Sequence, residues 1–157
     1  TGGQGMAGEI GHSILQIDGP LCSCGRHGCA ETFIGAEALT REMRETGHLE
    51  RAGRHLGVLL HNLWTTFNPG LLVLGGASCV RSPELVRIAN ETLAAHVARA
   101  GMAAPLVRTA RYGMQACAVG AAALVLHYYL RPMHPRDMPE AALGMDTPVD
   151  SSQHAIA

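Results

Sequence analysis

Apolar residues in the middle of the chain recur at helical spacing. Residues 36–46, "AEALTREMRET", favour a helix that stops at Gly47. The next segment, residues 49–67, follows the i, i+3, i+4 rhythm of one buried helical face. Residues 68–70, "NPG", predict the end of this second helix. The positions that we expect on its buried face are Leu56, Leu59, Leu60, Leu63, Trp64 and Phe67.

Two short apolar runs predict strands on either side of another helix. Residues 71–76, "LLVLGG", suit a strand buried on both faces, as in a parallel sheet. Residues 105–110, "PLVRTA", predict a second strand. Between them, Ser82 and Pro83 predict the cap and first residue of a helix that runs to about Ala100. Since residues 115–130 predict a last helix of mostly small residues, the alternation indicates an α/β layer architecture.

The two ends of the chain lack such periods. Residues 1–35 are rich in glycine and indicate loops and short strands with little helix. From residue 131 onward Pro, Met and His accumulate without any period, so we expect residues 131–157 to form a mostly disordered tail. The opening "TGGQGMAG" indicates a fragment or a processed chain.

Composition narrows the class of protein. The 157 residues are 47% hydrophobic, which fits one domain with a real core. The formal net charge is -1, so this chain lacks the broad basic field of a nucleic-acid binder. No secretory signal is visible, and the longest apolar run falls short of the ~20 residues that span a bilayer. An odd count of 5 cysteines fits a reducing cytosol. We expect a soluble, cytoplasmic protein.

Three cysteines and a histidine form a candidate metal site near the N-terminus. His12, Cys22, Cys24 and Cys29 offer one imidazole and three thiolates, a set that matches tetrahedral zinc. Four protein ligands leave no open coordination position. The zinc would therefore be structural rather than hydrolytic.

Two features of this loop bear on the zinc hypothesis. Gly25 and Gly28 lie between the last two cysteines and allow a tight turn, so that the sulfurs can converge on one ion. His27 lies inside the loop and competes with His12 for the fourth place on spacing alone. The alternative is that the cysteines are ordinary buried or reactive thiols.

The same stretch resembles the signature of the ROK family, named after repressors, open reading frames and kinases. The family pattern is Glu-x-Gly-His, a spacer, and then Cys-x-Cys-Gly-x-x-Gly-Cys-x-Glu. The segments "NPGLLVLGG" and "VGAAALVL" also resemble later parts of the family, so that the likeness covers roughly residues 1–130. The positions that meet the signature are Glu9, Gly11, His12, Cys22, Cys24, Gly25, Gly28, Cys29 and Glu31.

The resemblance implies a fold and a site. The fold would be the C-terminal lobe of the actin-like (ribonuclease H-like) sugar-kinase fold, with residues 1–130 as a zinc-containing sugar-binding lobe. His12, not His27, would join the cysteines as the fourth zinc ligand. Glu9 and Glu31 would hydrogen-bond sugar hydroxyls, and His12 would reach the sugar with its other edge. Without the resemblance, both glutamates would be interpreted as surface charges.

The sequence motifs that are typical of the kinases in the family are matched less well. Gly75 and Gly76 match a nucleotide-side glycine turn, although a strand ending in a turn explains them equally. Kinases tend to have a third glycine here, where this chain has Ala77. The Asp-x-Gly-Gly-Thr phosphate loop and the Asn-Asp pair of the N-terminal lobe do not occur, so this chain alone should not transfer phosphate.

Two function classes follow from the resemblance. The first is the sugar-sensing domain of a transcriptional regulator, which would bind DNA through an N-terminal winged helix-turn-helix outside this chain. The alternative is the C-terminal lobe of a sugar kinase, glucokinase- or fructokinase-like, which would need ATP and Mg²⁺. A zinc-dependent interaction module is a third, weaker reading. Family members are commonly dimers or tetramers, so a homo-oligomer is expected.

Overall fold

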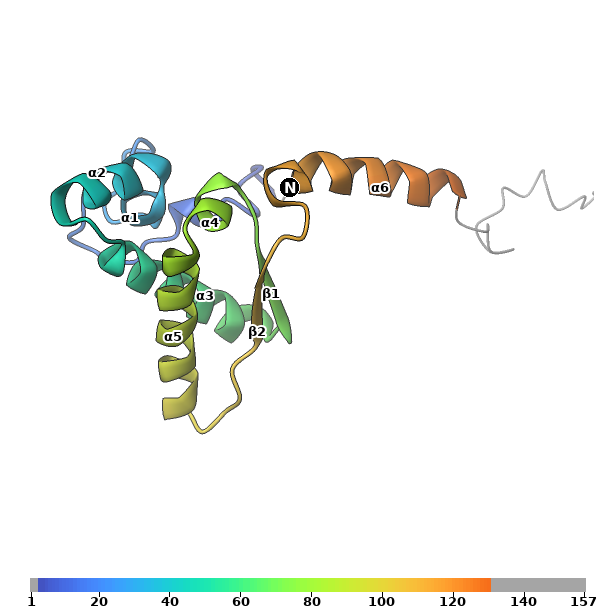
Figure 1. Ribbon diagram of the computed structural model, residues 1–157. Helices are drawn as coiled ribbons and strands as arrows, with labels where there is room; N and C mark the ends of the chain where they lie inside the picture. The colour runs from blue at the N-terminus through green and yellow to red at the C-terminus, as the bar shows by residue number, and fades with distance from the viewer. Residues whose placement is uncertain (1–2, 131–157) are drawn as a thin grey trace, which may run out of the picture. The chain divides into compact units, whose positions relative to one another are not determined.

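The computed structural model describes residues 3–130, which fall into two units, Thr1–Cys117 and Ala118–Ala157 (Figure 1). Each unit is described by itself, and the predicted tail, 131–157, lies outside the described residues. The elements in chain order are η1 (Ile10–His12), α1 (Glu31–Ile34), α2 (Ala36–Thr46), α3 (Glu50–Phe67), β1 (Leu71–Leu74), α4 (Ala77–Arg81), α5 (Pro83–Arg99), β2 (Leu106–Thr109), η2 (Gly113–Gln115) and α6 (Ala116–Leu130).

The core of the first unit forms where α3 packs on α5. Gly53 and Gly57 lie on the contact face of α3, and a Cβ at Gly53 would fall 2.6 Å from the Cβ of Ile88 on α5. The two helix backbones therefore approach closely because these positions carry no side chain. Around this contact lie the buried side chains of Leu56, Leu60, Trp64, Leu85, Leu93 and Val97.

The two strands form a parallel pair beside these helices (Figure 1). Leu72 pairs with Val107, and both pack against the core together with Leu74. The other sheet face carries Leu71 and Val73, which are exposed in the described unit. The expected parallel pairing is confirmed, whereas burial of β1 on both faces is wrong for the described residues.

The helix boundaries follow the expected stop signals. Gly47 ends α2 with a left-handed backbone (φ 77°), and its N–H donates to the Met43 carbonyl. Asn68 ends α3 in the same region (φ 45°), which asparagine tolerates better than most residues. The predictions of α2, α3, α5 and α6 are confirmed.

Other details depart from the expectations. Phe67 is 73% exposed, because it lies at the last position of α3, beyond the contact with α5. Ser82 precedes α5, but its side chain makes no capping hydrogen bond. The short helices α1 and α4 were not expected, and the N-terminal region contains isolated bridges instead of strands among its described residues.

The last helix is apolar throughout. Residues 113–130 have a mean hydropathy of 1.3 over 18 residues, enough by length and composition to cross a membrane. The expectation that no apolar segment is long enough is therefore wrong on this criterion. A core helix of a soluble protein meets the same criterion, so this is weak evidence for a membrane span.

Candidate functional site

A folded-back loop carries the cysteines. Backbone bridges join Ile14 to Cys29 and Leu21 to His27, both antiparallel. The Leu15 N–H donates to the Gly28 carbonyl at 2.8 Å, which ties the two sides of the loop together. Residues far apart in the sequence therefore meet without a regular strand.

Within the loop, a tight turn brings Cys22 and Cys24 to one side. The Cys22 N–H donates to the Arg26 carbonyl at 2.8 Å, and the Gly25 N–H donates to the Cys22 carbonyl at 2.9 Å. Gly25 has a φ of 83°, a conformation that residues with a Cβ rarely adopt. The predicted role of this glycine in turning the backbone is borne out by its geometry.

Gly28 is needed for a second reason. A Cβ at this position would fall 1.5 Å from the carbonyl oxygen of Gln16, and its φ is 67°. The backbone of residues 16–19 therefore lies directly against Gly28, and only glycine fits. This approach holds Cys29, the next residue, at the centre of the loop.

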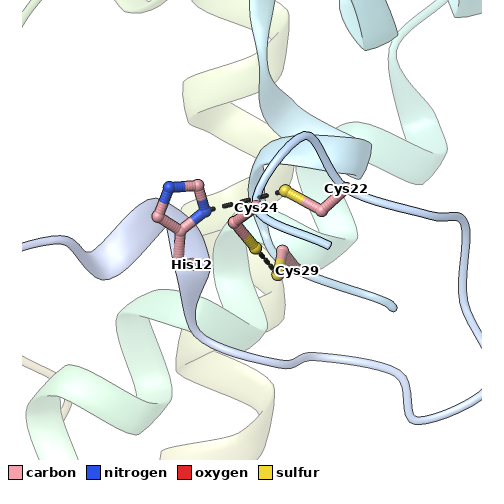
Figure 2. A group of neighbouring side chains, drawn as sticks. All are labelled: His12, Cys22, Cys24 and Cys29. Atoms are coloured by element: carbon pink, nitrogen blue, oxygen red, sulfur yellow. Dashed lines mark hydrogen bonds between the residues drawn. The ribbon is translucent and has the colours of Figure 1, made fainter. Parts of the chain in front are cut away.

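The structure brings the four predicted ligands together. The ligand atoms of His12, Cys22, Cys24 and Cys29 all lie within 4.8 Å of one another. Figure 2 shows the side chains pointing toward a common centre, with His12 Nδ1 3.6 Å from Cys22 Sγ and Cys24 Sγ 3.6 Å from Cys29 Sγ. Tetrahedral zinc with Zn–S of about 2.3 Å and Zn–N of about 2.0–2.1 Å needs edges of about 3.8 Å and about 3.6 Å. The four residues thus fit zinc in donor type and spacing.

His27, the competing candidate, is engaged elsewhere. Its Nδ1 lies 3.0 Å from the Gly19 carbonyl oxygen, and its backbone forms the bridge with Leu21. Because a carbonyl oxygen can only accept, His27 Nδ1 is the donor of this hydrogen bond. The cluster includes His12 instead, as the resemblance implied.

The three thiols differ in their environments. Hydrogen bonding from the Arg26 backbone N–H, and then from its side chain, lowers the pKa of Cys24 to about 6. Burial raises the pKa of Cys29 to about 11. A bound dication would offset that cost, because a coordinating thiol is deprotonated outright. The cluster therefore contains one thiol that ionises readily, Cys24, and one that needs a nearby cation to ionise at neutral pH, Cys29.

Glu31 begins α1 directly beside the cluster. Its Oε2 lies 3.6 Å from His12 Nδ1 and 3.7 Å from Cys22 Sγ. The short helix is held in place by Phe33, which is buried and stacks on His55 of α3 with ring centroids 4.0 Å apart. The position of the Glu31 carboxylate thus depends on the loop on one side and the core on the other.

Of the three predicted sugar contacts, only Glu31 lines a cavity, whereas Glu9 and His12 lie outside it. Glu9 precedes η1 and is exposed, and His12 ends the same turn. Glu31 lines a cavity of about 500 Å³ together with Cys22, Thr32 and Arg41, a volume typical of small-molecule sites. Glu9 and His12 are not among its lining residues. Sequence reasoning missed Arg41, although its spacing of four from Glu37 on α2 could have placed both on one face.

Gly75 and Gly76 form the turn between β1 and α4. Gly76 has a φ of 90°, and its carbonyl accepts a hydrogen bond from the Val80 N–H at 3.2 Å. The turn alone accounts for Gly76. Contact with a nucleotide therefore stays a prediction.

The sequence carries a family signature along most of its length. The ROK family model matches residues 1–51 and 46–128. The chain belongs to the ROK family. Its fold is accordingly the α/β fold of ROK sugar kinases, within the actin-like superfamily.

Curated ROK relatives include both regulators and enzymes. The xylose repressor of Bacillus subtilis (strain 168) is 26% identical over 151 residues, covering 82% of this chain and 39% of the repressor. The N-acetylmannosamine kinase of Vibrio cholerae is 44% identical over 45 residues, covering 29% of this chain and 16% of the kinase. The chain thus spans well under half of these relatives.

Solved ROK structures share the fold. The ROK hexokinase from Thermus thermophilus superposes with a TM-score of 0.65 at 31% identity, covering 75% of this chain and 47% of that one. A ROK glucokinase from Streptomyces griseus, solved with glucose and AMPPNP, gives a TM-score of 0.57 at 22% identity and covers 75% of this chain and 51% of that one.

Proposed function

We propose that residues 1–130 form the zinc-stabilised, sugar-sensing lobe of a ROK transcriptional regulator. The observation that carries this proposal is the extent of similarity to the xylose repressor, which covers 82% of the chain. The curated N-acetylmannosamine kinase match covers only 29%. Ala77, in place of a third glycine beside β1, also favours a protein that does not depend on tight nucleotide binding.

Zinc would be held by His12 Nδ1 and the three thiolates. Bound there, it would supply rigidity to the loop and no open coordination position for chemistry. With Nδ1 committed, His12 Nε2 remains free to contact a ligand. The ion would also attract the Glu31 carboxylate beside the cluster and so help to hold that group in place.

The sugar would be held by carboxylates. Glu31, and Glu9 from the turn that ends at His12, would accept hydrogen bonds from vicinal hydroxyls, which are strong because the acceptor is charged. The cavity beside Glu31 does not include Glu9 or His12 among its lining residues, so Glu31 is the predicted sugar contact that this cavity supports directly.

Sensing would work by a population shift. A sugar that binds one arrangement of the lobes better than another changes their ratio, and so changes the affinity of an upstream domain for DNA. We expect the full-length protein to be a cytoplasmic homo-oligomer that contacts DNA only through that domain.

Sugar binding and DNA binding by the full-length protein test this function. We expect one neutral sugar from a panel that includes xylose and glucose to bind by calorimetry and to change the affinity for operator DNA. Glu31→Gln should weaken sugar binding by at least tenfold, because a charged acceptor is lost. Glu84→Gln, on the exposed start of α5, is the matched control and should bind normally. Sugar binding without any effect on DNA would contradict the regulator assignment.

A sugar kinase is the second candidate, favoured by the hexokinase likeness at 31% identity. In that case Gly75 and Gly76 would lie near ATP and Mg²⁺, and the general base would come from the missing N-terminal lobe. ATP-dependent phosphorylation of the bound sugar by the full-length protein would establish the kinase and overturn the pure regulator. Failure to find zinc by metal analysis would overturn the proposed site in both.

A further inference from the structure

Two histidines from different helices face each other toward the C-terminal ends of α3 and α5. The imidazole rings of His61 on α3 and His96 on α5 have centroids 5.3 Å apart, with an angle of 50° between their planes. Both side chains are half-buried, so the pair is sheltered and still accessible from solvent. Neither residue belongs to the cysteine cluster.

The packing of α3 on α5 places this pair. A Cβ at Gly57 would fall 2.5 Å from the Cβ of Thr92, so the two helix backbones lie very close there, as they do one turn earlier at Gly53. Residues four apart share a helix face. One turn further along both helices, His61 therefore comes opposite His96.

Buried neighbours hold both histidines in position. Leu60 and Trp64 lie beside the α3 histidine, and the side chains of both are buried in the core. Leu93 and Val97 lie beside the α5 histidine and are fully buried. The Trp64 ring also lies 5.9 Å from the imidazole of the α3 histidine, measured between centroids. Side chains anchored on packed helices lose little conformational entropy when they converge on a ligand.

The ring nitrogens of the pair are available to a ligand. Within residues 3–130 neither ring takes part in a side-chain hydrogen bond or an ion pair, unlike the rings of His12, His27 and His55. A neutral imidazole has one nitrogen with a free lone pair, and this is the atom that binds a metal ion. Each helix thus contributes one such nitrogen to the same place.

We propose that His61 and His96 together bind one divalent transition-metal ion. Imidazole nitrogen suits Zn²⁺, Ni²⁺ and Cu²⁺. A metal–nitrogen bond of about 2.0–2.1 Å, with the nitrogen about 1.1 Å from the ring centre, places each ring centre about 3.2 Å from the ion. Two rings at a tetrahedral angle then have centres about 5.1 Å apart. The observed separation of 5.3 Å fits one shared ion.

This site differs in character from the cysteine cluster. Three thiolates and one imidazole close the coordination sphere of zinc, whereas two imidazoles leave positions open to water or to an external ligand. The ion between the helices would therefore be held more weakly and would exchange more readily. Because it binds the folded helix pair and not the unfolded chain, it would stabilise the contact of α3 with α5. The inference is independent of the choice between regulator and kinase.

The competing explanation is aromatic packing at the edge of the core. His61, Trp64 and His96 form a continuous group of rings that would shield the apolar residues beneath them. That explanation predicts that another aromatic ring at position 96 preserves every property of the protein. It also predicts that no metal ion binds there.

Calorimetry with Ni²⁺ on the full-length, zinc-loaded protein tests the proposal. We expect Ni²⁺ to bind at the pair without release of zinc. His61→Ala and His96→Phe should each weaken this binding by at least tenfold, because each removes one of the two protein ligands. Ni²⁺ should also raise the melting temperature of the wild type and not that of His96→Phe. The control His48→Ala removes a single exposed histidine before α3 and should bind Ni²⁺ normally.

The variants distinguish a shared ion from the alternatives. Weakened binding in both His61→Ala and His96→Phe, with the control unchanged, supports the proposal. Absence of Ni²⁺ binding by the wild type overturns it, as does weakened binding in only one of the two variants. Binding that persists in both variants and releases zinc into solution also overturns it, because the nickel would then occupy the cysteine cluster. Since His96→Phe keeps an aromatic ring, it removes the ligand without opening a cavity.

Discussion

The carboxylate of Glu42 on α2 accepts a hydrogen bond from the backbone N–H of Ala52 on α3, at 3.0 Å. Its other oxygen accepts from the Arg51 N–H at 2.7 Å. Glu42 is only 2% exposed and is the buried polar side chain among the otherwise apolar core of the described residues. Because Leu49, the residue before α3, has no capping side chain, Glu42 serves as the cap of α3 from a different helix. These two hydrogen bonds join α2, which follows the cysteine loop, to the start of α3, which forms part of the core.

Glu42→Ala should therefore destabilise the protein. The buried Ala52 N–H and the partly buried Arg51 N–H lose their partner, and a loss of about 2–4 kcal/mol in the free energy of unfolding follows. Urea denaturation, followed by circular dichroism, measures this change. Glu45→Ala removes an exposed carboxylate three positions along the same helix and should stay within about 0.5 kcal/mol of the wild type. Equal effects of both substitutions would contradict the capping role.

Periodicity predicted the long elements but not such tertiary contacts. The apolar rhythm of α3 and the runs of β1 and β2 are visible because each spans enough residues to show its period. Helices α1 and α4 have 4 and 5 residues, about one turn, too short for any period to appear. The role of Glu42 depends on residues nine and ten positions away in another helix, so its sequence neighbours alone indicate only a helical surface charge.

The candidate metal site was predictable in part for a chemical reason. Thiolate and imidazole donors are few, so their spacing already indicates zinc. The choice between His12 and His27 depended on the family resemblance, because the Gly19 carbonyl that engages His27 is visible only in three dimensions.

Gly28→Ala should disrupt the cysteine loop. The added Cβ would meet the Gln16 carbonyl oxygen at 1.5 Å, so the backbone must move and Cys29 with it. We expect the purified variant to contain much less than one zinc per chain, measured by atomic emission. Gly25→Ala is the control, since a Cβ there meets nothing within 4 Å. It should keep its zinc and lose only about 1 kcal/mol of stability, because of the positive φ. Full zinc content in Gly28→Ala would contradict this packing.

Cys24→Ser should remove both zinc and stability. Loss of one ligand of a structural zinc site removes folding free energy, because the metal binds the folded loop and not the unfolded chain. Thermal melting with parallel metal analysis tests this. Cys79→Ser, on α4 and outside the cluster, should keep the zinc content and melt within a few degrees of the wild type. A Cys24→Ser variant that retained zinc and its melting temperature would argue against a structural metal.

The thiols should differ in their reaction with iodoacetamide once zinc has been removed with a chelator. Cys24, which is exposed and has a pKa of about 6, is mostly thiolate at pH 7, so its alkylation rate should rise between pH 5 and 7 and then level off. Cys29, which is buried and has a pKa of about 11, should react slowly below pH 9.

Mass spectrometry of the modified peptides across this pH range measures both rates. Arg26→Gln removes the side-chain part of the stabilisation and should move the Cys24 midpoint to higher pH, while the backbone part remains. Arg54→Gln, remote from the loop, should leave the midpoint in place. Zinc-loaded protein should be protected at both cysteines, because coordinated sulfur is a poorer nucleophile than free thiolate. A common midpoint near pH 9 for both thiols would show that the Arg26 contact does not hold the Cys24 thiolate.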